Sequence, residues 1–295
     1  MSPLTATDRF WLWMARRVDR TALAVIGAQP VLRAVFEVSA RLGGALPRGM
    51  IPIRDQHDGL WFRPDGVARD APLILYLHGG GFTIGSPGTH RALVGHLAQA
   101  AGLRAVAPRY RLAPEHPFPA ARDDAIAAYR RLVEAGTPPV ALCGDSAGGC
   151  LALQVSAHAR DAGWPMPKAL GLIAPIADLS GDIETRFAKA QDEILIPPVW
   201  PRRIRRAYLA GLDPALPAIS PLLGDLTGLP PALIQVGSGE ALADDAHRLQ
   251  AAMDDVTLDL WPGMAHVWQI HAGRAPAADR AVTQMGAFLR EKALG

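Results

Sequence analysis

The chain has 295 residues, of which 49% are hydrophobic and 20% charged, an ordinary composition for a globular protein with a large core. Its formal net charge is +2, which gives no reason to expect a nucleic-acid partner. No run of about 18 apolar residues predicts a membrane span, and no targeting segment is evident. We therefore expect a cytoplasmic protein with no membrane partner.

Two helical patterns precede the first strand pattern. Apolar residues recur at helical spacing over about 7–26, and a second helix is predicted over 30–42. Phe10, Trp11 and Trp13 are expected to form an aromatic face on the first helix. We expect residues 1–48 to form an N-terminal helical cap segment with a lid-like role. A plain packing appendage is the alternative.

Residues 49–295 are predicted to form the main domain, in which strands and helices alternate. Predicted strands span 51–53, 60–62, 73–77, 103–107, 140–143, 169–174, 232–236 and 256–261. Predicted helices span 89–101, 120–134, 147–160, 241–253 and 277–292. This alternation favours an α/β fold with a mostly parallel central sheet and helices on both faces. In such sheets, functional residues gather at the carboxyl ends of the strands.

Residues 180–221 interrupt this alternation. The stretch is rich in proline and charge, lies between two predicted strands, and contains the arginine-rich run 201–206. We expect it to form a second cap insertion over the site. The arginines are interpreted as a solvated helix face, and a docking patch is the alternative.

The most informative motif is the run Gly144-Asp145-Ser146-Ala147-Gly148, which directly follows a predicted strand. A strand, a G-x-S-x-G turn and a helix in succession are typical of a nucleophile elbow, which holds a serine at the tip of a sharp turn. Glycine is needed at both ends because a side chain there would collide with the tight backbone. Ser146 is therefore the candidate nucleophile.

Cys143 and Cys150, the only cysteines, flank this turn. A disulfide between them would cross the sharpest turn in the chain. Two reduced, buried thiols are therefore the favoured interpretation, and two cysteines do not make the disulfide framework of a small secreted protein.

A glycine run, His78-Gly79-Gly80-Gly81, follows the predicted strand 73–77. Successive glycines let backbone amides face one point, as a tetrahedral oxyanion requires. A phosphate-binding loop is the alternative, but such a loop has a Lys-Ser/Thr pair at the start of the next helix, and this chain has none there. We interpret the run as an oxyanion loop in which His78 is structural.

The candidate general base is His266, which follows the last predicted strand. His271 is its competitor, but it lies further along the chain with no loop pattern around it. The acid is expected between the strand 232–236 and the base, and the carboxylates there are Glu240, Asp244 and Asp245.

Glu240 is favoured because it lies in the loop, where its side chain can reach an imidazole. Asp244 and Asp245 begin a helix, where acidic residues commonly act as caps or dipole partners. The resulting chain order, Ser146 then Glu240 then His266, is that of the α/β-hydrolases.

Taken together, these motifs resemble the bacterial hormone-sensitive-lipase-like family (family IV) of carboxylesterases, which have the α/β-hydrolase fold. The resemblance covers roughly residue 73 to the C-terminus and rests on the segments 78–81, 110–120, 144–149 and 262–266. It implies that the amides of Gly80, Gly81 and Ala147 donate to the oxyanion. It also implies a helical cap, built from an N-terminal segment and a segment after the elbow.

Three positions depart from the pattern of that family. Its acid is usually an Asp followed by Pro-Leu, where this chain has Glu240-Ala241-Leu242. Cys150 stands where Asn is frequent, and Arg109 stands where an acidic or polar residue often precedes the tyrosine. The sequence offers no functional account of the last two.

The sequence therefore predicts a serine carboxylesterase that hydrolyses short-chain acyl esters through an acyl-enzyme, with a Ser-Glu-His triad and a backbone oxyanion hole. The expected partner is a small-molecule ester, and the mechanism requires no metal or organic cofactor. The resemblance also makes a homodimer possible. The alternatives are an amidase or lyase acting at the same site, and a non-catalytic member of the fold that binds a small molecule.

Overall fold

The computed structural model describes residues 3–190 and 192–295. One eight-stranded sheet runs through the molecule in the order β1-β2-β4-β3-β5-β6-β7-β8. The strands are β1 (Ile53–Arg54), β2 (Leu60–Phe62), β3 (Leu73–Leu77), β4 (Arg104–Ala107), β5 (Ala141–Asp145), β6 (Ala169–Ile173), β7 (Ala232–Gly237) and β8 (Val256–Trp261). β2 runs antiparallel to both of its neighbours, β1 and β4, and the remaining neighbours in the order, from β4 through β3 to β8, pair in parallel. The predicted mostly parallel sheet is confirmed.

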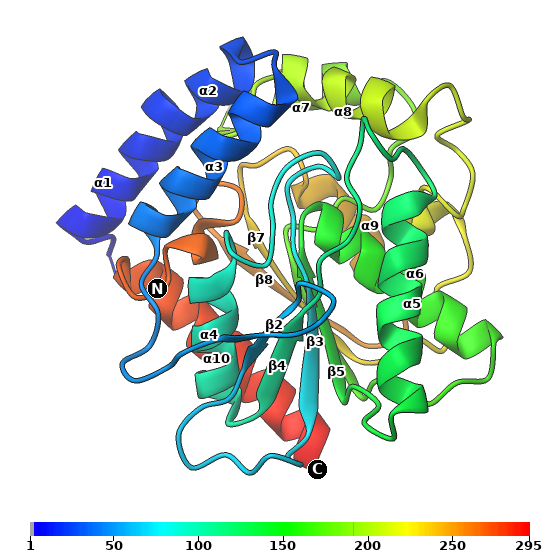
Figure 1. The fold of residues 1–295 in the computed structure, drawn as a ribbon. Helices are drawn as coiled ribbons and strands as arrows, with labels where there is room; N and C mark the ends of the chain where they lie inside the picture. Colours follow the sequence, from blue (N-terminus) through cyan, green and yellow to red (C-terminus); the bar gives the residue numbers. More distant parts are fainter. Residues whose placement is uncertain (1–2, 191) are drawn as a thin grey trace.

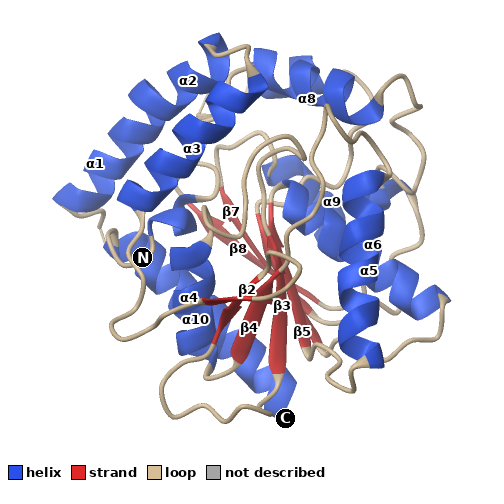
Figure 2. Cartoon of the chain, in the orientation of Figure 1, coloured by secondary structure: helices blue, strands red, loops and turns tan. Residues whose placement is uncertain are grey.

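Helices cover both faces of the sheet, as predicted (Figures 1 and 2). On one face α4 (Arg91–Ala101) packs against α10 (Pro276–Leu294), and the other face carries α5 (Ala120–Glu134), α6 (Ala147–Asp161) and α9 (Ala243–Ala252). Because both faces are covered, every residue of β3, β5, β6 and β7 is buried. The predicted strands and helices of this domain are all present, with ends shifted by at most two residues.

A second group of helices lies over one end of the sheet (Figure 1). The predicted first helix is continuous but consists of α1 (Ala6–Met14), a π-helical turn η1 (Ala15–Asp19) and α2 (Arg20–Val25). It packs beside α3 (Gln29–Gly43), and the interrupting stretch supplies α7 (Ile183–Lys189) and α8 (Val199–Leu209). We call these six segments the cap helices.

The aromatic group expected on the first helix is divided between two faces. Trp11 faces inward and stacks on His271, with ring centroids 4.6 Å apart. Phe10 and Trp13 are 50% and 55% exposed. Positions 10 and 13 share a helix face because they lie three residues apart, whereas position 11 points elsewhere. The ring of Phe10 contacts that of Trp11 edge-on, with centroids 5.1 Å apart, but only Trp11 faces inward, so the expectation that all three form one face is wrong.

The arginine run of α8 is only partly a solvated face. Arg202 and Arg206 are exposed, as predicted. Arg203 instead donates to the carbonyls of Leu23 and Ile26 at the end of α2, at 3.1 and 3.4 Å. The solvated interpretation is wrong for Arg203, which joins the two parts of the cap.

Cys143 and Cys150 are free and buried, as predicted. Burial raises the pKa of the Cys143 thiol to about 12, so it is protonated at neutral pH. Within the described ranges, no helix is long and apolar enough to cross a membrane. The same residues contain no cluster of three or more His, Cys, Asp or Glu side chains that could hold a metal ion.

Candidate active site

Ser146 stands at a sharp turn between β5 and α6. Its backbone, with φ 51° and ψ −118°, lies in a region that non-glycine residues rarely occupy. A Cβ atom at Gly144 would collide with the backbone of Gly148, and one at Gly148 would collide with the carbonyl of Leu77. The structure therefore contains the tight strand-to-helix turn that the motif predicts.

The glycine run after β3 forms a loop beside this turn. Gly80 and Gly81 have φ of +111° and +58°, a backbone conformation that favours glycine. The amides of Thr83 and Ile84 both donate to the carbonyl of Gly80, at 3.1 and 3.0 Å, which fixes the loop. Across the turn, α6 begins at Ala147, so its first amides have no partner within the helix and point toward the same end of the sheet.

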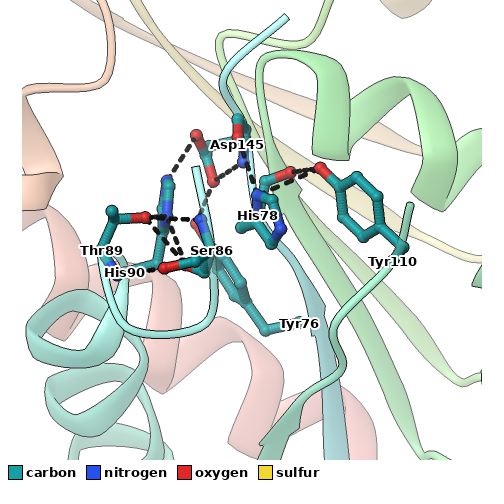
Figure 3. A network of polar contacts seen from close by, with 8 residues as sticks. Tyr76, His78, Ser86, Thr89, His90, Tyr110 and Asp145 are labelled. Atoms are coloured by element: carbon teal, nitrogen blue, oxygen red, sulfur yellow. Dashed lines mark hydrogen bonds and ion pairs between the residues drawn. The ribbon is translucent and has the colours of Figure 1, made fainter. Parts of the chain in front are cut away.

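Asp145 ties the serine turn to the glycine loop (Figure 3). Its carboxylate accepts from the amide of Gly79 at 2.9 Å and from the hydroxyl of Tyr76 at 2.8 Å. The ring Nε2 of His90 lies 3.2 Å from its second oxygen. Burial alone would raise the pKa of Asp145, but His90 and these hydrogen bonds outweigh burial and lower it. The residue before the candidate nucleophile is thus a buried anion.

His78 is part of the same network and is structural, in line with its interpretation. The hydroxyl of Tyr110 donates to the carbonyl of His78, and the two rings stack with centroids 4.1 Å apart (Figure 3). Burial lowers the pKa of His78 to about 3, so its ring is neutral at physiological pH.

His266 and Glu240 form a buried pair, as the sequence predicts. The ring Nδ1 of His266 lies 2.6 Å from one carboxylate oxygen of Glu240. The other oxygen accepts from the amide of Gly237 at 2.6 Å, which orients the carboxylate. Burial alone would lower the pKa of His266, but the charge and hydrogen bond of Glu240 outweigh it, so the pKa is raised.

The competing residues are engaged elsewhere. Asp245 accepts from the amides of Ala177 and Asp178 and pairs with Arg186 at 2.6 Å, so it has a structural role. Asp244 has a side chain 60% exposed. His271 stacks on Trp11 and its Nδ1 lies 3.1 Å from the carbonyl of Gly43.

The sequence analysis missed Glu193, a buried carboxylate in the loop between α7 and α8. One of its oxygens accepts from the amides of Leu195 and Ile196, each at 2.9 Å. The other accepts from the amide of Ala241 at 3.1 Å, directly after Glu240. Its charge also raises the pKa of His266. Nothing in the local sequence marks this residue, because its contact joins segments far apart in the chain.

One cavity brings the predicted residues together. Ser146, His266, Gly80 and Gly81 line it, while Glu240 lies behind His266 and outside the wall. The cavity is open to solvent at its mouth and extends to residues of the cap helices. A hydroxyl, an imidazole oriented by a carboxylate, and a glycine loop thus share one mostly apolar chamber. That set of groups is suited to acyl transfer.

Comparisons with known proteins agree with this chemistry. A family described as alpha/beta hydrolase fold matches residues 74–270. An acetyl-hydrolase of Streptomyces hygroscopicus is 49% identical over 236 residues, which cover 78% of each chain.

Two solved structures are similar along almost the whole chain. An esterase from the bacterial hormone-sensitive lipase family has a TM-score of 0.88 and 36% identity, covering 99% of this chain and 100% of that one. The esterase EstE5, in a crystal soaked with p-nitrophenyl butyrate, has a TM-score of 0.86 and 34% identity over the same shares.

Proposed function

This chain belongs to the α/β-hydrolase fold family and is a carboxylic ester hydrolase of the bacterial hormone-sensitive-lipase-like type (family IV), and from that premise we propose that it hydrolyses short-chain acyl esters through an acyl-enzyme on Ser146. The observation that carries the proposal is the buried His266–Glu240 pair, 2.6 Å apart, whose imidazole shares a cavity wall with Ser146.

In the first half of the proposed reaction, Ser146 Oγ attacks the ester carbonyl carbon while His266 Nε2 takes the hydroxyl proton. The bond to Glu240 holds the proton on Nδ1, which leaves Nε2 free to accept, and it stabilises the imidazolium that forms. His266 then gives the proton to the departing alkoxide, and the acyl group stays on Ser146.

In the second half, His266 takes a proton from water, whose oxygen attacks the acyl-enzyme carbonyl. Ser146 Oγ leaves and recovers the proton from His266, and the carboxylic acid is released. The amides of Gly80, Gly81 and Ala147 are the proposed donors to the oxyanion in both halves. Losing one such donor lowers kcat by roughly 10²–10³-fold in a related case.

The short acyl preference is supported by the relatives. One is named an acetyl-hydrolase, and the crystal of another was soaked with a butyrate ester. The apolar wall of the cavity suits an alkyl chain, and its buried acid–base pair suits chemistry away from bulk water.

The test is a p-nitrophenyl ester series from acetate to palmitate, measured with the wild type and with Ser146→Ala. We expect kcat/KM to peak at a short chain and the serine variant to lose nearly all turnover while unfolding at the same temperature. Ser238→Ala, at an exposed serine near the same end of the sheet, is the matched control and should keep full activity. Retained activity in Ser146→Ala would overturn the proposed nucleophile, and turnover of amides in preference to esters would favour an amidase.

A further inference from the structure

The wall of the cavity that faces the cap contains one carboxylate with an incomplete set of partners. Along the first helix, the lining residues recur every three or four positions, at Leu12, Ala15, Asp19 and Ala22. This spacing places Asp19 on the inward face of the helix, among apolar neighbours. Ser39 lies opposite on α3, also in the cavity wall, and its hydroxyl donates to Asp19 Oδ1 at 3.0 Å.

A comparison with Asp8, on the same inward face, shows what Asp19 lacks. Asp8 accepts from the amides of Thr5 and Ala277 at 2.9 and 2.8 Å and from the hydroxyl of Thr5 at 2.8 Å. These bonds lower its pKa although burial opposes them. At Asp19 burial dominates and raises the pKa, because the hydroxyl of Ser39 compensates only in part.

No cation among the described residues pairs with Asp19. Arg205 lines the same cavity, but its guanidinium donates to the carbonyl of Gly181 at 2.8 Å. None of the ion pairs formed by residues 3–190 and 192–295 includes it. Arg20, the next residue, points its guanidinium at the carbonyls of Glu193 and Ile196, at 3.1 and 2.9 Å. A carboxylate on an apolar wall without a cation is costly to desolvate, so a merely structural tie between the two helices would be better made by a neutral pair.

Building on the proposed function, we infer that Asp19, oriented by Ser39, binds a protonated amine on the part of the ester substrate that extends from Ser146 toward the cap helices. Polar groups that are few and well placed in an otherwise apolar pocket set orientation and specificity. An ammonium N–H donated to this carboxylate makes a charge-assisted hydrogen bond and supplies the positive charge that the site lacks. The favoured substrates are amino esters, with ester and amine separated by an apolar spacer.

The experiment compares esters that differ only in this charge. In the first pair the amine is in the alcohol half: dimethylaminopropyl butyrate against isohexyl butyrate, which has the same shape and no charge. In the second pair it is in the acyl half: the p-nitrophenyl ester of dimethylaminohexanoic acid against its isopropyl-ended neutral analogue. We expect the wild type at pH 7 to favour the amine in one of the two pairs, and that pair identifies the half that reaches Asp19.

Asp19→Asn should remove that preference, by a factor of roughly ten to a hundred in kcat/KM, the range of one hydrogen bond to a charged group. The neutral esters should react with Asp19→Asn almost as they do with the wild type. Ser39→Ala should weaken the preference to a smaller extent, and Asp70→Asn, at an exposed aspartate, should leave it unchanged.

Two results would overturn the inference. One is a wild type that favours the neutral ester in both pairs, a measurement that needs no variant to fold. The other is an Asp19→Asn protein that loses the same factor on amine and neutral esters, as a purely structural role predicts. Failure of the proposed function would look different, because Ser146→Ala would then keep activity on all four esters.

Discussion

Two buried histidine–carboxylate pairs adjoin the cavity that holds Ser146, and they differ in what the second ring nitrogen of the histidine contacts. In one, His90 Nε2 lies 3.2 Å from Asp145, and its Nδ1 lies 2.7 Å from the hydroxyl of Thr89 (Figure 3). In the other, His266 Nδ1 lies 2.6 Å from Glu240. Both histidines line the cavity that holds Ser146. Among the described residues, however, Nε2 of His266 forms no hydrogen bond, whereas both ring nitrogens of His90 have partners.

Burial and a carboxylate partner therefore do not distinguish a catalytic histidine from a structural one. His90 is 1% exposed and His266 is 6% exposed, so both are largely removed from water. What separates them is that His266 keeps one ring nitrogen without a protein partner, and a base needs such a nitrogen to accept the proton of a nucleophile. By that criterion we assign the His90–Asp145 pair to the scaffold and propose that the His266–Glu240 pair moves protons.

The largest effect on activity is expected from replacing His266, and the same replacement at His90 serves as the comparison. His266→Gln keeps a donor for Glu240 but has no basic nitrogen, so kcat for p-nitrophenyl butyrate should fall about 10⁴-fold or more, with little change in Tm. His90→Gln should lower kcat much less and Tm more, because it disturbs the support of the glycine loop. If His90→Gln loses as much activity as His266→Gln at an unchanged Tm, the assignment of a structural role to His90 is wrong.

The second prediction concerns Asp145, the acceptor of the structural pair. Asp145→Asn removes a buried charge that accepts from Gly79, Tyr76 and His90. Breaking a buried pair in this way costs about 3–5 kcal/mol of unfolding free energy, measurable by urea denaturation.

The pH dependence of that loss has a definite sign. The pKa of Asp145 is lowered by folding, so its stabilisation is present above the unfolded value of about 3.9 and disappears as pH falls further. The stability gap between Asp145→Asn and the wild type should therefore narrow in acid. A gap that stays constant into acid would show that the carboxylate charge is not what stabilises the fold.

How far the sequence predicts these two pairs depends on whether a local pattern marks each residue. Ser146, Gly80 and His266 each follow a predicted strand within a short motif, and a parallel sheet brings such positions to one edge. Glu240 could be chosen over Asp244 because loop and helix positions are distinguishable from local pattern.

Other parts of the site depend on contacts that no local pattern records. Glu193 reaches Ala241 only because an irregular loop of the insertion folds back onto the acid loop. The bond between Asp19 and Ser39 depends on how two cap helices face each other across the cavity. Trp11 points inward because its position lies on a different helix face from positions 10 and 13. The three aromatic residues are so close in the sequence that this difference is easy to overlook.

The third prediction concerns how kcat/KM depends on pH. His266 must be neutral to act as the proposed general base, so activity should fall as the pH drops through its raised pKa. Asp145, Glu240 and Glu193 are the carboxylates that raise this pKa.

Glu193→Gln removes one negative charge, so the acidic limb of the kcat/KM profile should move to lower pH. Glu134→Gln, at an exposed position on α5, is the matched control and should leave the limb in place. An unmoved limb in Glu193→Gln would mean that Glu193 only holds the loop.

The smallest expected effect comes from a variant in the cap helices. It tests whether the cap supports only the His266–Glu240 pair and not the His90–Asp145 pair. Arg20 donates from α2 to two carbonyls of the loop that carries Glu193, and that loop bonds the residue after Glu240. Arg20→Met keeps the apolar stem and removes these bonds, which contribute about 1 kcal/mol each, so kcat/KM should fall several-fold. Arg16→Met, at an exposed position one turn earlier, should be neutral. The His90–Asp145 pair bonds the sheet and the segment 86–90 and not this loop. The Tm should therefore fall by only a few degrees in Arg20→Met, as the loss of these bonds alone predicts, and should not change in Arg16→Met. A large fall in Tm for Arg20→Met would mean that the cap also supports the His90–Asp145 pair. The proposed separation of a structural His90 from a catalytic His266 would then be wrong.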